Sequence, residues 1–430
     1  MTTGNSSSPF ENNVYAKSDG TTLADHRNNC VQVLLEVKKA FESSVSEFLS
    51  SYGIPADEFW KQVQFTVSNH DFGKLNTAFQ EKIRKAMKSP KIRKNELPKD
   101  VPHNLISTLF FVNERLFHLK SDDRINYGAM AAMYHHGPLK GVEWLDNKKE
   151  LFNRQEKIDF IGLPQYLSFD TGVEKEFMPD SPIIDKIEKQ GVESRALKII
   201  IDKKFLKPGK TESLGTIETR RWIFPLFKQF LHLSDWIGSG AKARPLAIND
   251  MWKKTSTILD RKRDMQTELR KKLSDVASAI PRRAILQAPT GSGKTEAAIR
   301  WGSIWNKPRF IFALPTRSLV DDLYYRFQGG NGTQGYFSSE TGILHSTSEY
   351  TYESLEGDDP ESHDFDKYFH RPVMVTTIDQ VVISLFNTGR WDAVNFSLAL
   401  GALVIDEIHA YDEDTLSLIM ELIVQSKKFN

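Results

Sequence analysis

"LQAPTGSGKTEAAIRWG", residues 286–302, places a glycine-rich loop between a short apolar run and a helix. The glycines let backbone amides approach a phosphate, and the N-terminus of the following helix adds the positive end of its dipole. Lys294 is suited to neutralise the β- and γ-phosphates of a nucleotide, and Thr295 to bind Mg²⁺. The residues assigned to the nucleotide here are Ala288, Thr290, Gly291, Ser292, Gly293, Lys294 and Thr295. The plain alternative is a Gly/Ser turn before a helix.

A second motif, "ALVIDEIHAYD" at 402–412, brings two carboxylates to the end of an apolar strand. Taken alone, two acidic residues after a strand usually belong to a solvated loop. Downstream of a phosphate loop such a pair is typical of a Walker B motif. Asp406 is then expected to hold Mg²⁺ and Glu407 to polarise the attacking water.

Short apolar runs alternate with helical segments after Pro281, which predicts an α/β domain with a mainly parallel sheet. The stretch 329–371 is rich in Gly, Ser and acidic residues, so we expect it to be partly loop. The expected strands are 284–287, 310–313, 373–376 and 402–405.

Four polar residues lie at or just beyond the ends of two of these strands, in 313–327 and 373–386. They are Thr316, Arg317, Thr376 and Thr377. Their hydroxyl and guanidinium groups could follow the phosphates of a nucleic acid. The alternative is that the threonines cap helices.

The whole chain has the composition of a globular protein with more than one domain. It has 430 residues, of which 40% are hydrophobic and 26% charged, and its net charge is +1. A nucleic-acid partner would therefore need local basic clusters. Cys30 is the only cysteine and no apolar run is long enough to span a membrane, so we expect a cytoplasmic protein without a membrane partner.

The region 22–240 reads mostly as amphipathic helix. Apolar residues recur at helical spacing from Cys30 to Phe41, with His26 on the same stripe. A second such pattern from Arg221 leads to Asp235, which we expect to point inward. The stretch 145–215 shows no clear order.

Histidines and acids with the chemistry of metal ligands gather in this helical region. The candidates are His26, His70, Asp71, His103, His135, His136 and Asp235. A single histidine on an apolar helix face is more often a packed core residue. Burying several without partners would cost about 1 to 3 kcal/mol each, and a metal cluster removes that cost. Mixed imidazole and carboxylate ligands suit two ions if one carboxylate, Asp71, bridges them.

In its second half the chain resembles a superfamily 2 helicase. DEIH is a variant of the DEAH box, and the loop has the AxxGxGKT form common in that family, so Ala288 fits it. The segments 313–327 and 373–386 resemble motifs Ia and Ib, which touch the backbone of a single strand.

The first half resembles the HD phosphohydrolase superfamily through "HDFGK", the upstream His26, "YHHGP" and "SDWIGS". A second pair, His363 and Asp364, lies in the acid-rich stretch. An HD region followed by such a helicase core resembles the CRISPR-associated nuclease-helicase of type I interference systems, over about residues 20–430.

That resemblance implies a two-metal nuclease site. One ion would be held by His26, His70, Asp71 and Asp235, and the other by Asp71, His103, His135 and His136. Lys74 would lie near the scissile phosphate, so the implied catalytic residues are Asp71, Lys74 and Glu407. The assignment of His103 as a ligand assumes that "VPHNLIS" contains the isolated histidine of the family, with Ser107 as its companion. His118 is the alternative candidate for this ligand. The other histidines are expected in surface or core roles, apart from His409 in the DEIH box.

The implied function is cleavage of single-stranded DNA with two divalent transition metals (Mn, Fe, Co or Ni), coupled to ATP and Mg²⁺ in the helicase lobe. The implied partner is the crRNA-guided Cascade surveillance complex. The expected layout is multidomain: a polar lead-in (1–21), an all-α HD domain (22–240), a helical linker (241–280) and a first RecA-like domain (281–430).

Neither a Ser-Ala-Thr motif nor a second RecA-like domain occurs before Asn430. The lobe alone is expected to bind ATP weakly and to hydrolyse it slowly, unless a second lobe is supplied in trans. We expect a fragment, a truncated product or half of a split enzyme. Two other functions stay open: an HD nucleotide phosphohydrolase with a regulatory NTP-binding domain, and a non-catalytic docking module.

Overall fold

The structure is a computed structural model, and it describes most but not all of the chain. The described residues are 14–89, 102–111, 126–136, 157–158, 160–161, 192–193, 214–242, 244–264, 268–277, 279–330, 333–353 and 360–427. They divide into two compact units. We call the first, within 1–36 and 57–241, the helical unit, and the second, within 37–56 and 242–430, the sheet unit.

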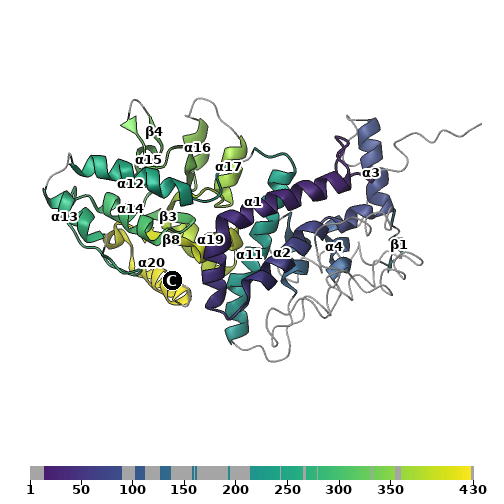
Figure 1. Ribbon diagram of the computed structural model, residues 1–430, viewed down its shortest axis with the longest axis horizontal. Coiled ribbons are helices and arrows are strands. Elements are labelled where there is room, and N and C mark those ends of the chain that lie inside the picture. The colour runs from purple at the N-terminus through teal and green to yellow at the C-terminus, as the bar shows by residue number, and fades with distance from the viewer. Residues whose placement is uncertain are drawn as a thin grey trace, which may run out of the picture. The chain divides into compact units, whose positions relative to one another are not determined.

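The helical unit is built from helices that are far apart in the sequence (Figure 1). Its elements are α1 (Leu23–Ser50, shared with the sheet unit), α2 (Ala56–Asn69), η1 (Phe72–Leu75), α3 (Thr77–Lys88), α4 (His103–Ser107), η3 (Thr108–Phe111), α5 (Tyr127–Tyr134) and α11 (Leu214–Gly238). A two-residue antiparallel pair, β1 (Lys157–Ile158) with β2 (Val192–Glu193), is the only ladder described in this unit. The predicted helical first domain is confirmed.

The expected apolar stripes of α1 and α11 form the core of this unit. Cys30 and Leu34 on α1 are buried, as are Phe227 and Phe230 on α11. Aromatic rings join α11 to α2, with the Phe59 and Phe227 ring centroids 5.0 Å apart. Burial of these apolar faces packs the helices against one another. This packing sets the distances between the polar side chains that the same helices carry.

The sheet unit contains a four-stranded, wholly parallel sheet with strand order β6-β7-β3-β8. Its strands are β3 (Arg309–Leu314), β6 (Thr341–Leu344), β7 (Val373–Thr377) and β8 (Gly401–Ile405). Its larger helices are α12 (Asn249–Asp264), α13 (Glu268–Ala277), α14 (Lys294–Trp305), α15 (Arg317–Gln328), α19 (Trp391–Leu400) and α20 (Glu413–Ser426). The short elements are β4 (Gly329–Gly330), β5 (Thr333–Gln334), η6 (Ser338–Glu340), α16 (Ser348–Glu353), α17 (Pro360–Lys367), α18 (Ile378–Val382), η7 (Ile383–Phe386) and η8 (Ile408–Ala410).

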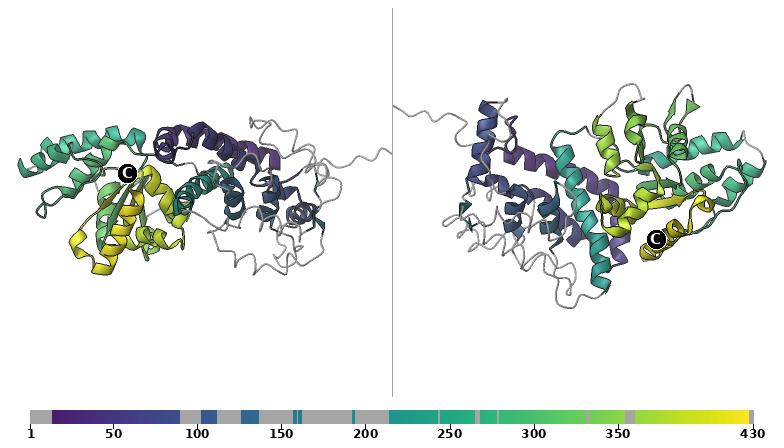
Figure 2. Two further views of the ribbon diagram at one scale, coloured as in Figure 1. Left: turned by 90° about the horizontal axis from the view of Figure 1, so that it is seen from below. Right: turned by 180° about the vertical axis from the view of Figure 1, so that it is seen from behind.

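Both faces of the sheet are covered, as a parallel sheet requires. Phe310 and Phe312 share one hydrophobic cluster with residues of α12, α14 and α15. Ile311 and Ala313, which alternate with them, are also buried, and α18 and α19 pack against β3. The expected α/β domain is therefore confirmed, and its chain can be followed to the yellow helix α20 (Figure 2).

One expected strand is wrong, and one strand of the four-stranded parallel sheet was not expected. Residues 284–287 form no strand in the described part of the chain, and Ile285 is 93% exposed. An apolar run becomes a strand only when a neighbouring strand supplies its hydrogen bonds, and none does so here. Conversely, β6 lies in the stretch 329–371 that was expected to be partly loop, and it pairs with β7.

The stretch 241–280 is helical, as expected, but it does not act as a linker. Ile248 and Trp252 are buried in the hydrophobic cluster of the sheet, and the Trp252 indole N–H donates to the Lys307 carbonyl. The second half of α1 also belongs to the sheet unit. There Glu47 lies 2.5 Å from the ammonium of Lys307 and 2.5 Å from the guanidinium of Arg282. Residues 37–56 therefore group with the sheet, although 22–240 was expected to form one domain.

Across the described residues, every helix is too short or too polar to cross a lipid bilayer.

Candidate functional site

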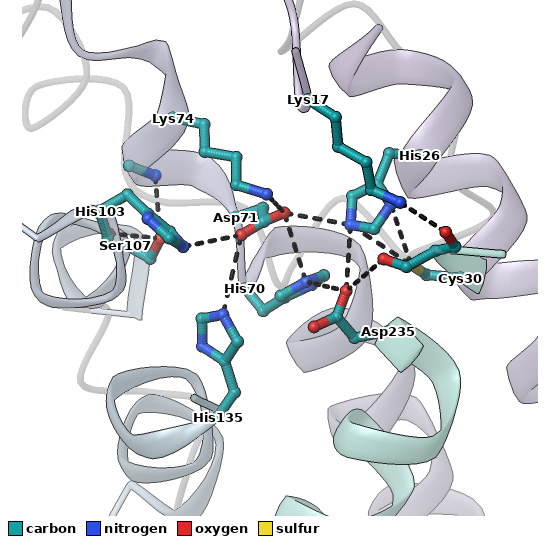
Figure 3. Close-up of polar contacts among 12 residues, drawn as sticks. Lys17, His26, Cys30, His70, Asp71, Lys74, His103, Ser107, His135 and Asp235 are labelled. Carbon is teal, nitrogen blue, oxygen red and sulfur yellow. Dashed lines mark hydrogen bonds and ion pairs between the residues drawn. The ribbon is translucent and has the colours of Figure 1, made fainter. Parts of the chain in front are cut away.

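The seven candidate metal ligands of the sequence lie together in the helical unit, and Figure 3 labels all of them except His136. They come from the start, end or inner face of five helices. His26 lies on α1, His70 and Asp71 directly follow α2, His103 is the first residue of α4, His135 and His136 directly follow α5, and Asp235 lies on α11. Side chains that lie up to about two hundred positions apart in the sequence thus come together in one cluster.

The first group of ligands consists of His26, His70, Asp71 and Asp235. The Nε2 atom of His26 lies 3.1 Å from Asp71 Oδ2 and 3.2 Å from Asp235 Oδ1. The Nε2 atom of His70 lies 3.5 Å from each of the same two oxygens. These four side chains can each direct one ligand atom at a common point.

The second group consists of His103, His135 and His136, and it faces the other oxygen of Asp71. Asp71 Oδ1 lies 3.3 Å from His103 Nε2 and 3.8 Å from His135 Nε2. The Nε2 atoms of His103 and His136 are 2.9 Å apart. One carboxylate therefore presents a separate oxygen to each group, which is the arrangement that a bridging ligand needs.

Backbone carbonyls orient two of the imidazole rings. His70 Nδ1 is 2.8 Å from the Val67 carbonyl oxygen, and His135 Nδ1 is 2.6 Å from that of Ala132. The Nδ1–H of each ring donates there, so Nε2 points into the centre and is the nitrogen that would bind an ion when the ring is neutral. Both Nε2 atoms and both oxygens of Asp71 are buried, and the polar groups that they contact are other residues of the centre and Lys74. Metal ions would satisfy these buried atoms, so the residues present fit a metal centre.

A close backbone approach sets the position of His103. A Cβ atom on Gly73 would lie 2.0 Å from the His103 carbonyl oxygen, so only glycine allows η1 and α4 to meet here. The Gly73 N–H donates to Ser107 Oγ at 2.9 Å, and the Ser107 hydroxyl donates to the His103 carbonyl at 2.9 Å. Ser107 is the companion expected for His103. His118, the competitor, lies outside the described residues.

Charge at the centre is divided between its two groups of ligands. Burial alone would lower the pKa of His70, but the carboxylates of Asp71 and Asp235 outweigh it and raise that pKa to about 9. The pKa of His26 is raised for the same reason. In the second group, burial and the neighbouring His103 lower the pKa of His136 to about 4, and burial holds the pKa of His135 well below its ordinary value.

The carboxylates and Lys74 complete the electrostatics of the centre. Burial would raise the pKa of Asp71, but the nearby Lys74 and His70 hold it well below its ordinary value. Lys74 Nζ lies 2.5 Å from Asp71 Oδ2. The pKa of Asp235 is also held well below its ordinary value, because hydrogen bonds from His26 and His70 outweigh burial. Both carboxylates are therefore anionic and ready to bind cations at neutral pH.

Raising the pH of the metal-free protein should destabilise the helical unit. His70 has a folded pKa of about 9, above its unfolded value, so its contribution is fully present below the unfolded pKa and is lost as the pH rises through about 9. The free energy of unfolding should fall by up to about 1.4 kcal/mol per pH unit over this window. Urea unfolding of the chelator-treated chain at several pH values measures it. The same slope in His70→Asn would contradict the assignment.

The remaining histidines described in the structure lie apart from the seven ligands. The His232 ring packs on Trp236 with centroids 5.2 Å apart, and His370 is buried. His345 is buried with Nε2 3.1 Å from Asp321 Oδ1. His363 belongs to the second His-Asp pair and lies on α17, with Nε2 3.9 Å from Glu349 Oε1. These positions agree with the surface and core roles expected for them.

Cys30 lies beside the first group but does not belong to it. Its Sγ atom is 3.7 Å from His26 Nε2, and burial raises the pKa of its thiol to about 12. The thiol is therefore neutral at physiological pH, whereas a metal ligand would need to be a thiolate.

The phosphate loop has the local geometry that its sequence predicts. Gly291 and Gly293 have φ values of +76° and +93°, which a residue with a side chain rarely adopts. α14 begins at Lys294 directly after Gly293, so the loop leads into a helix N-terminus. Lys294 Nζ donates to the Ala288 carbonyl at 3.3 Å. The side chain thus folds back over its own loop, as a lysine that neutralises bound phosphates must.

The acidic pair lies beside this loop. Asp406 and Glu407 follow β8, and the Asp406 N–H donates to the Ala313 carbonyl at 3.0 Å, which extends the ladder to β3. Glu407 Oε1 lies 4.0 Å from Lys294 Nζ. Glu407 has φ +51°, an uncommon backbone conformation for a residue with a side chain and one that is often found at functional sites.

The four expected nucleic-acid contacts do not share one environment. Arg317 is exposed at the start of α15, and Thr316 caps that helix by accepting from the Leu319 N–H at 3.4 Å. Thr376 and Thr377 are buried, and the Thr376 hydroxyl donates to the Leu344 carbonyl at 2.6 Å. The Thr376 hydroxyl is therefore bonded within the sheet, and the proposed contacts of these two threonines with phosphates stay a prediction.

Some residues that build the centre could not be singled out from the sequence. Gln80 is fully buried, and its side-chain amide donates to the carbonyls of Tyr15 and Lys74. Its Oε1 accepts from the Tyr15 N–H. It thereby ties the segment before α1 to the loop that carries Lys74. A glutamine on a helix carries no sequence signal for this role.

A helical unit with a His/Asp centre, joined to a parallel-sheet unit with a phosphate loop and a DEIH box, defines a protein of the HD-domain and helicase class. The family model for the Cas3 HD domain matches residues 18–243, and that for DEAD/DEAH box helicases matches residues 265–429. The first match covers more than half of the chain, which therefore belongs to the Cas3 HD-domain family.

Two relatives of this chain are themselves named Cas3. The chain is 35% identical over 150 residues to the CRISPR-associated nuclease/helicase Cas3 of Methanothermobacter thermautotrophicus, covering 33% of this chain and 17% of the relative. It is 30% identical over 162 residues to the CRISPR-associated endonuclease/helicase Cas3 of Escherichia coli K12, covering 33% of this chain and 18% of that protein. The matched parts thus span less than a fifth of either relative.

A solved structure shares the fold. The crystal structure of T. fusca Cas3-ADP matches with a TM-score of 0.57 and 17% sequence identity, covering 98% of this chain and 50% of that chain. At this identity the likeness concerns the fold alone. The chain therefore spans about half the length of the solved protein.

Proposed function

We propose that this chain is a metal-dependent nuclease for single-stranded DNA, coupled to an ATP-dependent helicase lobe, that takes part in CRISPR interference. The observation that carries the proposal is the placement of Asp71, whose two carboxylate oxygens face two separate groups of histidines. The side chains of His70, Asp71 and His135 are all buried there. The names of the relatives, nuclease and helicase, support the same reaction.

In this proposal, His26, His70, Asp71 and Asp235 would hold one divalent transition ion, and Asp71, His103, His135 and His136 the other. Two such ions lower the pKa of a bound water and stabilise the leaving oxygen of a phosphodiester. The chain supplies the rest of the chemistry. Asp71 keeps the two sites in register, the carbonyls of Val67 and Ala132 hold two rings in position, and Lys74 offers a cation to the scissile phosphate.

In the sheet unit, the proposed ligand is ATP with Mg²⁺. Lys294 would neutralise the phosphates, Thr295 and Asp406 would bind Mg²⁺, and Glu407 would orient the attacking water. Arg317, exposed beside the carboxyl ends of the strands, is the residue proposed to contact the phosphates of the DNA strand. On family grounds, we also propose that a crRNA-guided surveillance complex delivers the DNA, and that a second helicase lobe completes the motor.

Cleavage of circular single-stranded DNA tests the nuclease assignment. The wild-type chain should nick the circle when Mn²⁺ or Ni²⁺ is added, and chelation should lower the rate at least about 100-fold. His232→Asn is a matched control, because its imidazole lies on α11 near Asp235 but outside the centre. Phosphate release from free nucleotides without DNA cleavage would instead favour a nucleotide phosphohydrolase, and the nuclease proposal would fail.

Replacing Lys294 with alanine should weaken ATP binding about 10-fold or more. A charge-assisted hydrogen bond to phosphate contributes roughly 1.5 to 3 kcal/mol, and the loop has no second lysine to take its place. Titration with a fluorescent ATP analogue measures the dissociation constant. Lys254→Ala removes an exposed lysine from α12 and should leave it unchanged. Equal affinity in wild type and Lys294→Ala would show that the loop does not bind the nucleotide.

A further inference from the structure

The metal centre has a closed side and an open side. The side chains of His26 and Asp71 are only 1% and 6% exposed. The open ligands are Asp235 at 19%, His103 at 15% and His136, which is exposed. A substrate that reaches the proposed ions must therefore arrive past Asp235, His103 and His136.

A pocket of about 440 Å³ lies between the segment before α1 and the helix α3. Its lining residues are Ala16, Lys17, Ser18, Asp19, Phe79, Lys82, Ile83 and Ala86. Phe79 contacts one open ligand, and Lys17 is connected to a second through Ser239. The Phe79 ring meets the His103 ring edge-to-face, with centroids 5.3 Å apart. Lys17 donates to the Ser239 carbonyl, and the Ser239 hydroxyl lies 3.3 Å from Asp235 Oδ1.

The walls of this pocket are held in place by buried hydrogen bonds. Gln80, fully buried on α3, binds the backbone of Tyr15 through both its donor and its acceptor, and it also reaches the Lys74 carbonyl. The Ala16 N–H donates to the Thr21 carbonyl at 2.8 Å. The segment that carries Lys17 is therefore fixed against α3 and against the loop that carries Lys74 and Asp71.

The chemistry of the pocket matches a nucleotide. Phe79, Ile83 and Ala86 form an apolar floor, and Phe79 is only half-buried. Two lysines on the rim, Lys17 and Lys82, outnumber the one carboxylate, Asp19, which already accepts from the N–H and hydroxyl of Thr21. An aromatic ring beside cations is the combination that binds single-stranded nucleic acid without regard to sequence. The volume is within the range of small-ligand sites.

We propose that this pocket binds the nucleotide next to the scissile phosphate, with its base stacked on Phe79 and its phosphate attracted by Lys17 and Lys82. The inference rests on the proposed nuclease function and names how that site holds a single strand. Since Phe79 touches the open ligand His103, a base stacked there keeps its neighbouring phosphate at the metal centre. The site would therefore accept single strands and exclude duplexes, whose bases are already stacked.

Abasic oligonucleotides test this proposal in the full chain. Thymidine oligonucleotides with one abasic position, moved along the strand, are bound to the chelator-treated protein and the dissociation constants are measured. Wild type should lose about 5- to 150-fold in affinity when the abasic position meets Phe79. Phe79→Leu should show that loss with intact DNA and no further loss with the abasic strand, while Phe79→Trp should behave as wild type.

Two controls separate stacking from a structural role of Phe79. Metal content after Mn²⁺ loading should be equal in wild type and Phe79→Leu, because a ring that only supports His103 would lower it. Tyr350→Leu removes a 70% exposed aromatic ring from the sheet unit. This variant should lose affinity for the abasic strand by the same factor as wild type. An abasic effect of the same size in Phe79→Leu and wild type would overturn the inference. A wild-type chain that neither binds nor cleaves the oligonucleotide would instead refute the proposed function.

Discussion

Replacing Asp71 with asparagine is expected to remove both metal ions and to reduce DNA cleavage at least about 100-fold. Asp71 presents a carboxylate oxygen to each group of histidines, Oδ2 to His26 and Oδ1 to His103. An amide lacks the negative charge that holds two cations together. Elemental analysis after metal loading, combined with the nicking assay, measures both effects.

The same experiment distinguishes a bridging ligand from an ordinary one. Asp235→Asn removes a carboxylate whose described ligand neighbours are the first-group histidines His26 and His70, so it should lose one ion and keep the other. His232→Asn, on the same helix, should keep both. If Asp71→Asn is folded by circular dichroism yet still binds two ions, the shared-carboxylate centre does not exist. One ion lost in Asp71→Asn and none in Asp235→Asn would argue against it as well.

Replacing Gly73 with alanine should displace His103 although no metal ligand is changed. The new Cβ would lie 2.0 Å from the His103 carbonyl oxygen, so α4 must move away from η1. Overpacking of this kind costs about 1 to 3 kcal/mol of stability. Because His103 moves with its backbone, the second ion should be lost and cleavage should fall. Thermal unfolding and metal stoichiometry measure the two consequences.

Gly53→Ala is the matched control for this substitution. Gly53 has φ +67°, so alanine there is strained, but nothing lies within 4 Å of its new Cβ. That variant should lose stability without losing metal. A Gly73→Ala chain that keeps two ions and full activity would show that the contact between η1 and α4 does not position His103.

Local chemistry made much of the site visible in the sequence. His70 and Asp71 are adjacent, His135 and His136 are adjacent, and the glycines of the phosphate loop directly precede Lys294, so each motif is readable on its own. The stripes of α1 and α11 follow the helical period, and they correctly indicated that His26 and Asp235 face inward. Such signals need no knowledge of the fold.

Other features depended on partners that no local pattern contains. Residues 284–287 have the apolar character of a strand but lie exposed, because strand formation needs a hydrogen-bonding neighbour. Thr376 was expected at a surface, yet its hydroxyl is bonded to Leu344 on the adjacent strand. The boundary between units falls inside α1, since its second half packs with the sheet unit. The apolar residues of α1 keep the same helical spacing along its length, so the sequence does not show where the helix passes from one unit to the other.

The sequence by itself determined the kinds of chemistry available: imidazoles and carboxylates in a helical region, and a phosphate loop with an acidic pair in an α/β region. Only the tertiary structure decided that one oxygen of Asp71 faces His26 while the other faces His103, and that Phe79 flanks the open side of the centre. The physical reason is that residue type and helical period are local properties. Distances between side chains on α1, α4, α5 and α11 arise only when the buried apolar faces of those helices pack together.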